Sequence, residues 1–320
     1  MGDPYLYARE QTVKSQPPGV LPVIAIFGPT GSGKSAVAEG LAGLVPAEIV
    51  SADAMQAYEG LRILTNQPAF PTRLVGIWPL THTASVGEYA QLAHAAIDEV
   101  LAAGRTPVVA GGTGLYLRAA LGELALPPAP AAGAREHYER VYERLGPERT
   151  HAALAARDPA AAEVVHANDR RRVVRALELL DAGSSLRPAE DRLFAEDVRH
   201  PTVVFGLDVP REALAARIEE RTHAMFERGV ADELRSAQAR GLSDTARHVI
   251  GLREVGALPR EEAIEAIVRR TMRYAAYQRK WLRRIPGVVS LRADRPAEEI
   301  AVEVLEVARA RQRLPAGRAG

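Results

Sequence analysis

The segment that most constrains this chain is a glycine-rich octapeptide that directly follows a short apolar run. The apolar residues 21–27 suit a buried strand, and residues 36–42 carry the spacing of a helix. A glycine-rich loop between a strand and a helix is the setting in which backbone N–H groups bind phosphate. We therefore predict a phosphate or diphosphate site here, with a plain glycine-rich turn as the alternative. The octapeptide fits G-x-x-x-x-G-K-[ST] and reads Gly28, Pro29, Thr30, Gly31, Ser32, Gly33, Lys34 and Ser35.

Each part of the octapeptide has a chemical role in this prediction. Its three glycines allow the backbone to turn N–H groups inward, and the following helix presents its positive end. Lys34 adds a mobile positive charge, and Ser35 adds a hydroxyl that can ligate Mg²⁺. Lys34 is one of only three lysines in a chain that otherwise uses arginine. A lysine at the position where the motif requires one favours the phosphate site over the plain turn.

The composition excludes several classes of chemistry. The chain has 320 residues, of which 47% are hydrophobic, so it can form a globular core. It contains no cysteine, which excludes disulfides, thiol catalysis and cysteine-ligated zinc. A formal net charge of +1 means that any nucleic-acid contact must come from local clusters of arginine. No run of eighteen apolar residues occurs. We expect a soluble, cytoplasmic monomer without a membrane segment.

Strand and helix signals alternate along the chain, which predicts an α/β fold. We expect a parallel sheet like that of P-loop NTPases, with helices on both faces. One helix starts at the capping box of Ser85 and Glu88, and later helices are expected at 210–229, at 259–284 and from about residue 296. Between two parts of this core, an alanine- and arginine-rich stretch carries helix-start signals at Asp158 and at Asn168-Asp169 and predicts an inserted helical subdomain. The predicted division is a disordered tail at 1–20, a core at 21–127 and 200–312, the helical insertion at 128–199, and a loose tail at 313–320.

Polar residues follow two of the predicted strands at the edge where ligands gather in such sheets. Asp53 comes after the strand at 48–51, and Thr113 ends the Gly-Gly-Thr turn after the strand at 107–110. We expect both to converge on the glycine-rich loop. Asp53 can hold Mg²⁺ or accept a proton, and its alternative role is to cap a helix. Asp208 is a rival metal ligand, although the following Pro210 favours capping there.

Two groups of arginines share helix faces. Helical spacing puts Arg171 and Arg175 on one face with Arg172 beside them, and a solvated helix surface is the simpler interpretation. Arg217 and Arg221 lie four residues apart, and two guanidinium groups in such a fork suit a phosphate. Pairing of these two arginines with neighbouring acids is the alternative.

The stretch 269–284 combines many cations with three aromatic residues and contains no acid. Because it lacks counter-charges for pairing within one helix, it predicts contact with an external anion such as an RNA backbone. The alternative is that the aromatic residues belong to the core and that the arginines extend past them into solvent.

Taken together, five segments resemble the tRNA dimethylallyltransferase family and occur in the order of that family. They are residues 28–35, 51–58, 111–116, 168–178 and 250–254. The resemblance runs from about residue 22 to residue 309 and includes the helical insertion. It implies that the loop holds the diphosphate of dimethylallyl diphosphate. It also implies that the acceptor is the exocyclic amine of the tRNA adenosine 3′-adjacent to the anticodon.

The resemblance also implies roles for individual residues. Lys34, with Mg²⁺ at Ser35, would stabilise the departing diphosphate, and Arg217 and Arg221 would reach it from the far side. Asp53 would accept the proton of the amine. Thr113 would line the passage through which the flipped base enters. The positions that match tRNA contacts of the family are Asp53, Ala54, Met55, Gln56, Thr113, Arg135, Arg171, Arg172 and Arg175.

The chain departs from the family pattern at three places. These are Leu64–Gln67 with the following proline, Arg73–Ile77, and Leu252. They leave the phosphate and base-entry motifs intact. Three other functions use the same loop: a small-molecule kinase that binds ATP with Asp53 or Asp208 on Mg²⁺, a prenyltransferase acting on a free adenine nucleotide, and an RNA-binding NTP switch without transfer chemistry.

Overall fold

The computed structural model describes residues 20–124, 131–186 and 198–313. These residues form two compact units, one from the described parts of 1–123 and 196–320, and the other from those of 124–195. The predicted tails at 1–20 and 313–320 fall outside the described residues, except that Val20 is buried and Arg313 ends the last helix. The predicted first residue of the insertion, 128, lies outside them too, whereas its predicted last residue, 199, is described.

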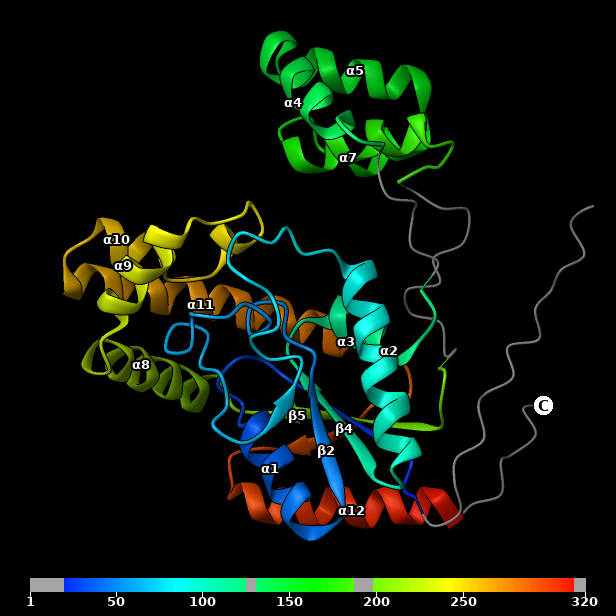
Figure 1. Ribbon diagram of the computed structural model, residues 1–320, viewed down its shortest axis with the longest axis vertical. Helices are drawn as coiled ribbons and strands as arrows, with labels where there is room; N and C mark the ends of the chain where they lie inside the picture. Colours follow the sequence, from blue (N-terminus) through cyan, green and yellow to red (C-terminus); the bar gives the residue numbers. More distant parts are fainter. Residues whose placement is uncertain (1–19, 125–130, 187–197, 314–320) are drawn as a thin grey trace, which may run out of the picture. The chain divides into compact units, whose positions relative to one another are not determined.

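The first unit is built on a parallel sheet, in which six strands of the described chain are ordered β3-β2-β4-β1-β5-β6 (Figure 1). Strand β1 lies between β4 and β5, with Ala25 opposite Val109 on one side and Val204 on the other. This arrangement confirms the predicted α/β sheet. The two-residue edge strand β3 was not predicted, because so short a strand carries no periodicity. The strands are β1 Val23–Phe27, β2 Ala47–Ser51, β3 Thr72–Arg73, β4 Thr106–Gly111, β5 Thr202–Asp208 and β6 Val289–Arg292.

Helices cover both faces of the sheet, as predicted. Helices α1 (Lys34–Leu44) and α12 (Ala297–Arg313) pack together on one face, while α2 (Val86–Ala102) and α3 (Gly114–Leu121) pack on the other (Figure 1). The core between the sheet and the first pair is aliphatic and closely packed. It includes Ile24, Ile26, Leu41, Phe205, Leu207 and Val304.

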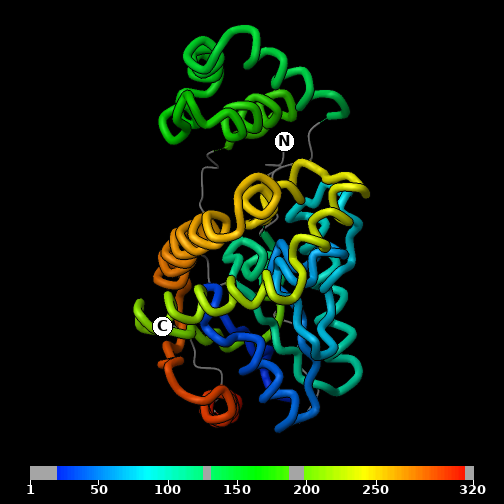
Figure 2. The backbone as a smooth tube through the Cα atoms, turned by 90° about the vertical axis from the view of Figure 1, so that its left-hand side faces the viewer, coloured from blue at the N-terminus to red at the C-terminus, as the bar shows by residue number. Residues whose placement is uncertain are grey.

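Four more helices and one 3₁₀ turn complete this unit. They are α8 Arg211–Glu227, α9 Val230–Arg240, η2 Ala246–His248, α10 Leu252–Ala257 and α11 Arg260–Leu282. Helix α11, orange in Figure 2, packs against both α8 and α3. The sequence predicted α8, α11 and the final helix but missed α9. This helix starts directly after Gly229, whose left-handed conformation (φ +87°) ends α8 and allows the chain to turn.

The second unit is helical in its described residues. Its helices are α4 Ala134–Leu145, α5 Pro147–Arg157, α6 Pro159–Val164 and α7 Arg170–Asp181. The predicted start signals are confirmed: Asp158 accepts the Ala161 N–H at 2.9 Å, and Asp169 accepts the Arg172 N–H at 3.2 Å. Both bonds satisfy helix donors that would otherwise lack partners. The unit has its own small core, which includes Leu154, Val173, Val174 and Leu177.

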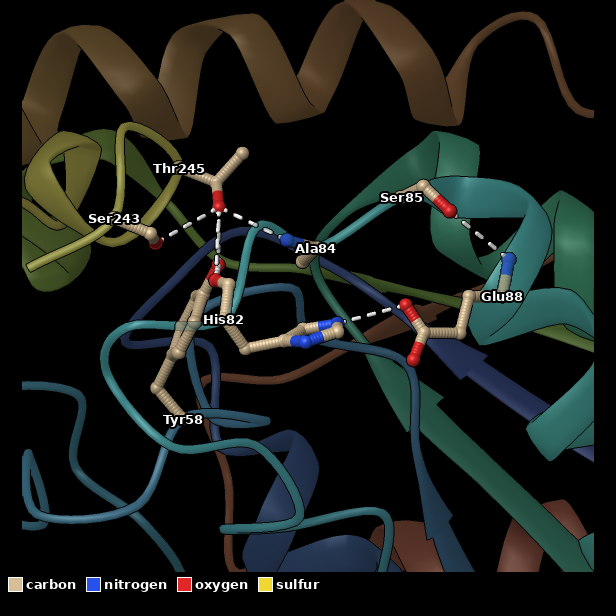
Figure 3. Close-up of polar contacts among 7 residues, drawn as sticks. All are labelled: Tyr58, His82, Ala84, Ser85, Glu88, Ser243 and Thr245. Atoms are coloured by element: carbon tan, nitrogen blue, oxygen red, sulfur yellow. Dashed lines mark hydrogen bonds and ion pairs between the residues drawn. The ribbon is translucent and has the colours of Figure 1, made fainter. Parts of the chain in front are cut away.

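A network of hydroxyl groups fixes the chain that follows Asp53 (Figure 3). The Thr245 hydroxyl lies at its centre, within hydrogen-bond distance of the Tyr58 hydroxyl, and accepts the Ala84 N–H at 3.0 Å. Nearby, Ser85 caps α2 as predicted by accepting the Glu88 N–H at 3.2 Å, whereas the Glu88 carboxylate pairs with His82 at 2.8 Å. The network therefore joins the chain after β2, the start of α2 and the segment before α10.

We expect Thr245→Val to destabilise the first unit by about 1–3 kcal/mol, because the Ala84 N–H loses its acceptor and the Tyr58 hydroxyl loses one partner. Urea unfolding followed by circular dichroism would measure this loss. Thr72→Val is the matched control, since the Thr72 hydroxyl donates to a carbonyl at an exposed site. Equal unfolding midpoints for the two variants would contradict a central role for Thr245.

Candidate functional site

The glycine-rich loop leaves polar groups available at the start of α1. Gly31 (φ +83°) and Gly33 (φ +90°) have left-handed conformations that favour glycine. Gly33 is the N-cap of α1, and no side chain caps this helix end. The buried Ser32 hydroxyl has no hydrogen-bond partner among the described residues. Uncapped N–H groups and an unpaired hydroxyl at a positive helix end fit an anionic phosphate group.

Lys34 is folded back onto the loop. Its Nζ donates to the Pro29 carbonyl at 2.9 Å. The residue keeps some exposed surface, but protein encloses its ammonium group, and this desolvation lowers the pKa of Lys34 to about 8. The negative charge of Asp53 opposes the shift, and the positive charge of Arg221 adds to it. A bound diphosphate would restore the charged form by supplying the missing counter-charge.

The two arginines of α8 have different surroundings. The Nη1 of Arg221 donates to the Thr30 hydroxyl at 2.9 Å, so this guanidinium touches the loop. Its Nε lacks a partner within the described chain, and burial lowers its pKa. Arg217, one turn earlier, donates to the Ala293 carbonyl at 3.1 Å beyond β6. Arg221 is thus already at the phosphate loop, whereas Arg217 is held at the neighbouring strand end.

Asp53 and Thr113 meet at the edge of the sheet, as expected from the parallel fold. The Ala54 N–H points to the Thr113 hydroxyl at 3.4 Å. Asp53 Oδ1 accepts the Met55 N–H at 3.0 Å and so stabilises its own turn, not a helix start. The carboxylate of Asp53 also lies close enough to Lys34 and Arg221 to act on their charges. The corner of Asp53 and Thr113 and the phosphate loop therefore lie side by side at the strand ends, where open α/β sheets bind ligands in a crevice.

Sequence reasoning missed two residues of this crevice, both on α11. The Tyr274 hydroxyl is 3.4 Å from the Thr113 hydroxyl, and burial raises the pKa of Tyr274 to about 12. Gln278 is buried and bonds to the Thr30 N–H and to the Gly112 carbonyl, each at 2.8 Å. The sequence contains a signal for the burial of Gln278, because helical spacing puts it on one face with Thr271 and Ala275 in an otherwise basic helix.

Gln56 holds the segment Leu64–Gln67, one of the three places where the chain departs from the family pattern. It lies within hydrogen-bond distance of the Ser51 hydroxyl at 3.2 Å and donates to the Asn66 carbonyl at 3.0 Å. From the other side, Glu233 accepts the Ile63 and Leu64 N–H groups at 2.7 and 2.8 Å. This segment is therefore fixed from two sides, and it packs next to the site.

Leu64 also lies against Gly251, the residue before the departure at Leu252, and its closeness accounts for the glycine there. A Cβ at position 251 would come within 2.5 Å of a Leu64 methyl group, and Gly251 has φ +102°. Glu254 closes the turn by accepting the Gly251 N–H at 3.0 Å. Two separate departures from the family pattern thus lie beside each other, where a change in one can accommodate the other.

The surroundings of Ser35 fit Mg²⁺. Ser35 is exposed in the first turn of α1 and lines a pocket with Glu39, Ser51 and Gln56, whose oxygen atoms suit a hard cation. The described residues hold no group of three or more His, Cys, Asp or Glu side chains that could bind a metal ion. Mg²⁺ needs no such cage, because it is commonly held by one or two protein oxygens together with phosphates and water.

The predicted tRNA-contacting arginines of the second unit divide into two kinds. Arg135 and Arg175 form ion pairs at 3.0 and 3.1 Å with the two oxygens of Glu178, whose side chain is 0% exposed. Arg171 and Arg172 are exposed in the first turn of α7. The first two therefore neutralise a buried carboxylate, while the second two are free to reach a ligand from the surface without loss of this pairing.

Some cations of the stretch 269–284 have counter-charges just outside that stretch. Arg269 pairs at 3.2 Å with Glu265, one turn earlier on the same helix. Arg270 pairs with Glu254 at 2.9 Å, and Arg279 lies 3.8 Å from Asp208. The last two acids lie on other elements, so their pairing is not visible in the local sequence. Asp208 likewise does not cap α8, whose N-cap is Pro210 without a side-chain bond. The exposed face of α11 carries Arg273, Tyr277 and Lys280, and the exposed Arg283 follows directly as its C-cap.

Comparisons with known proteins agree on one family. A family model described as IPP transferase matches residues 56–285. The chain is 41% identical to a tRNA dimethylallyltransferase of Thermobifida fusca, over 86% of this chain and 91% of that protein. The crystal structure of a tRNA isopentenylpyrophosphate transferase from Bacillus halodurans is similar with a TM-score of 0.63 and 30% identity, covering 91% and 99% of the two chains. A eukaryotic dimethylallyltransferase has the same fold, with a TM-score of 0.75, 24% identity, and coverage of 92% and 81%.

We expect pyrophosphate binding to weaken as the pH rises through about 8, because the Lys34 ammonium then loses its proton and its attraction for the anion. Above this pKa the affinity should fall by up to about tenfold per pH unit, and below it the ammonium contribution is complete. Calorimetry between about pH 7 and 9.5 would measure the profile. Lys34→Met, which lacks the titrating group, corrects for ionisation of the ligand. Parallel profiles for the two proteins would contradict this role.

Proposed function

The chain belongs to the IPP transferase family, and from this premise we propose that it is a tRNA dimethylallyltransferase. It transfers a dimethylallyl group from dimethylallyl diphosphate to the exocyclic amine of the tRNA adenosine 3′-adjacent to the anticodon. Diphosphate is released. The observation that carries the proposal is the single crevice in which the loop around Lys34 meets the corner of Asp53 and Thr113.

The phosphate loop binds and stabilises the leaving group. Its uncapped N–H groups, the Lys34 ammonium and the Arg221 guanidinium face the charge that grows as the allylic C–O bond breaks. Mg²⁺ held at Ser35 would supply Lewis-acid stabilisation of the same oxygens. Arg217 can join them if it leaves the Ala293 carbonyl. Arg221 thus touches the loop before the substrate binds, whereas Arg217 has to move to reach it.

The corner of Asp53 and Thr113 handles the acceptor. The adenosine must leave its stack to reach this corner, as in other enzymes that act on a base. The Thr113 hydroxyl lines the entry and orients the amine. As the new C–N bond forms, the amine becomes cationic, and Asp53 accepts its proton. Asp53 keeps one carboxylate oxygen on the Met55 N–H, which fixes the direction of the group.

Each of the two units supplies exposed cations for contact with the tRNA backbone. Arg171 and Arg172 lie at the positively charged end of α7, and the exposed face of α11 presents cations together with Tyr277, which is 55% exposed. Residues 54–56 follow Asp53 and would contact nucleotides next to the flipped base. Arg135 and Arg175 would contribute mainly by holding α7 in shape through Glu178.

The remaining parts of the proposal concern the state of the protein. In the described residues, no helix is long and apolar enough to cross a membrane. We expect the chain to act as a monomer, since every residue assigned to the loop and the corner comes from one unit. A tRNA acceptor would place the reaction in the cytoplasm. Mg²⁺ is the expected cofactor.

A labelling assay tests the proposal against its alternatives. The protein is incubated with Mg²⁺, unmodified tRNA and radiolabelled dimethylallyl diphosphate, and in parallel with labelled ATP or with AMP as the acceptor. Label in tRNA supports the proposal. Label from ATP in a small molecule would indicate a kinase, and prenylated AMP would indicate an enzyme acting on free nucleotide. Binding of RNA and NTP without transfer would indicate a switch.

Asp53→Asn should lower kcat by about 10²–10⁴-fold with little change in the affinity for either substrate, because it removes the proton acceptor and keeps the size of the side chain. Single-turnover rates with labelled dimethylallyl diphosphate measure this effect. If Asp53 instead serves the metal, added Mg²⁺ should restore activity and diphosphate binding should be weak. That result would remove Asp53 from the role of base.

Changing Arg171 and Arg172 together to alanine should weaken tRNA binding and flatten its dependence on salt. Each lost phosphate contact reduces the log–log slope by roughly 0.7–0.9. Because both residues are exposed, the melting temperature should stay within error. Arg135→Ala is the contrasting variant, since it leaves buried Glu178 with less neutralisation and should lower the melting temperature. An unchanged slope in the double variant would mark its arginines as ordinary surface residues.

A further inference from the structure

Gln278 joins the two sides of the crevice through one side-chain amide. Its Oε1 accepts the N–H of Thr30 in the phosphate loop at 2.8 Å, and its Nε2 donates to the Gly112 carbonyl at 2.8 Å. Only this orientation of the amide satisfies both neighbours, because the N–H needs an acceptor and the carbonyl needs a donor. The residue is 2% exposed. The same group therefore sets the distance between the loop after β1 and the turn after β4.

The turn after β4 is shaped to receive α11. A Cβ at Gly112 would lie 2.3 Å from the Gln278 Nε2, and a Cβ at Gly114 would lie 2.3 Å from the Trp281 ring. Between these glycines, Thr113 lies 3.4 Å from the Tyr274 hydroxyl. The glycines of this turn thus serve close approach by the helix, in addition to forming a turn. One face of α11 touches three successive residues at the acceptor corner.

The hydrogen bond between Gln278 and Thr30 also affects the orientation of the Arg221 guanidinium. Thr30 is held twice, through its N–H by Gln278 and through its hydroxyl by the Arg221 guanidinium at 2.9 Å. A shift of Thr30 would therefore move the hydrogen-bond partner of Arg221. In the proposed reaction Arg221 stabilises the leaving group, so Gln278 influences both the position of the donor loop and the direction of its positive charge.

We propose that Gln278 is a positioning residue, which aligns the diphosphate loop with the acceptor corner and touches neither reacting group. The inference rests on the proposed function, because it concerns the distance between the two substrates of a transfer. A misplacement of about 1 Å can cost about 10²-fold in the rate of such a reaction. A residue that only stabilised the fold would lower the stability and leave the rate of the folded enzyme unchanged.

Gln278→Met tests this role, since methionine has nearly the same length and makes neither hydrogen bond. The matched control is Gln312→Met on α12, where the Gln312 amide donates to the Val20 carbonyl at 2.7 Å near the start of β1. We expect Gln278→Met to lower kcat by about 10–100-fold while the KM for each substrate changes by less than about threefold. The control should keep the kcat of the parent protein.

Two further measurements separate positioning from folding. Rates are taken under single turnover at a temperature where circular dichroism shows the variants to be folded. Amide hydrogen exchange of the peptide that contains Thr30 should be faster in Gln278→Met than in the control, because this N–H has lost its acceptor. If Gln278→Met does not fold, Gln278→Glu replaces it. Glutamate keeps an acceptor for Thr30 but no donor for Gly112, and it should again lower kcat more than KM.

The outcomes distinguish this inference from the function on which it rests. If the parent protein prenylates tRNA and the Gln278 variants keep its kcat within about twofold, Gln278 is not a positioning residue and the proposed function stands. A loss that appears only in KM, or one that Gln312→Met shares, would also overturn the inference. If the parent protein forms no prenylated tRNA, both proposals fall together.

Discussion

The parallel register of β2, β4, β1 and β5 is the constraint on which the rest of the molecule depends. Ile26 of β1 lies opposite Ala110 of β4 and Phe205 of β5, so all three strands end at the same edge. Strand β1 is hydrogen-bonded to a neighbouring strand on each side. The glycine-rich loop therefore starts at the end of a rigid strand. The loop can then keep unpaired polar groups at a helix end without collapsing onto them. The phosphate loop and the corner of Asp53 and Thr113, to which diphosphate binding and transfer are assigned, both follow from this shared edge.

The parts that the sequence predicted are those encoded locally. The phosphate loop could be predicted from its own glycines and from the strand and helix on either side of it. Asp158 and Asp169 indicate the starts of the helices that they cap. The meeting of Asp53 with Thr113 followed from the rule that parallel strands end together. Spacing along the chain carries such information because each contact lies within one element or follows directly from the sheet.

What the sequence could not predict depends on partners far away in the chain. Gln278 bonds to Thr30, which lies 248 positions earlier, and Arg270 finds its counter-charge on α10. Seen alone, the cations of the stretch 269–284 predicted contact with an external anion such as RNA, with aromatic residues in the core as the alternative. In the structure, one side of α11 is a structural wall of the crevice and only the other side is exposed. Arg135 shows the same limit, since its partner Glu178 lies 43 positions later in the chain, whereas Arg175 reaches the same carboxylate within its own helix.

The strand order has a consequence for how the chain is made. Strand β1 leaves the ribosome early, but its neighbour β5 follows some 180 residues later, and α11 comes later still. The second unit lies between them and makes its described contacts among its own helices, including α4 with α7, so these contacts span far less of the chain than the pairing of β1 with β5 and form faster. It can therefore be complete while β1 still lacks one partner. The catalytic crevice would be among the last parts of the nascent protein to form, so an interrupted synthesis product would contain the phosphate-loop sequence without a working loop.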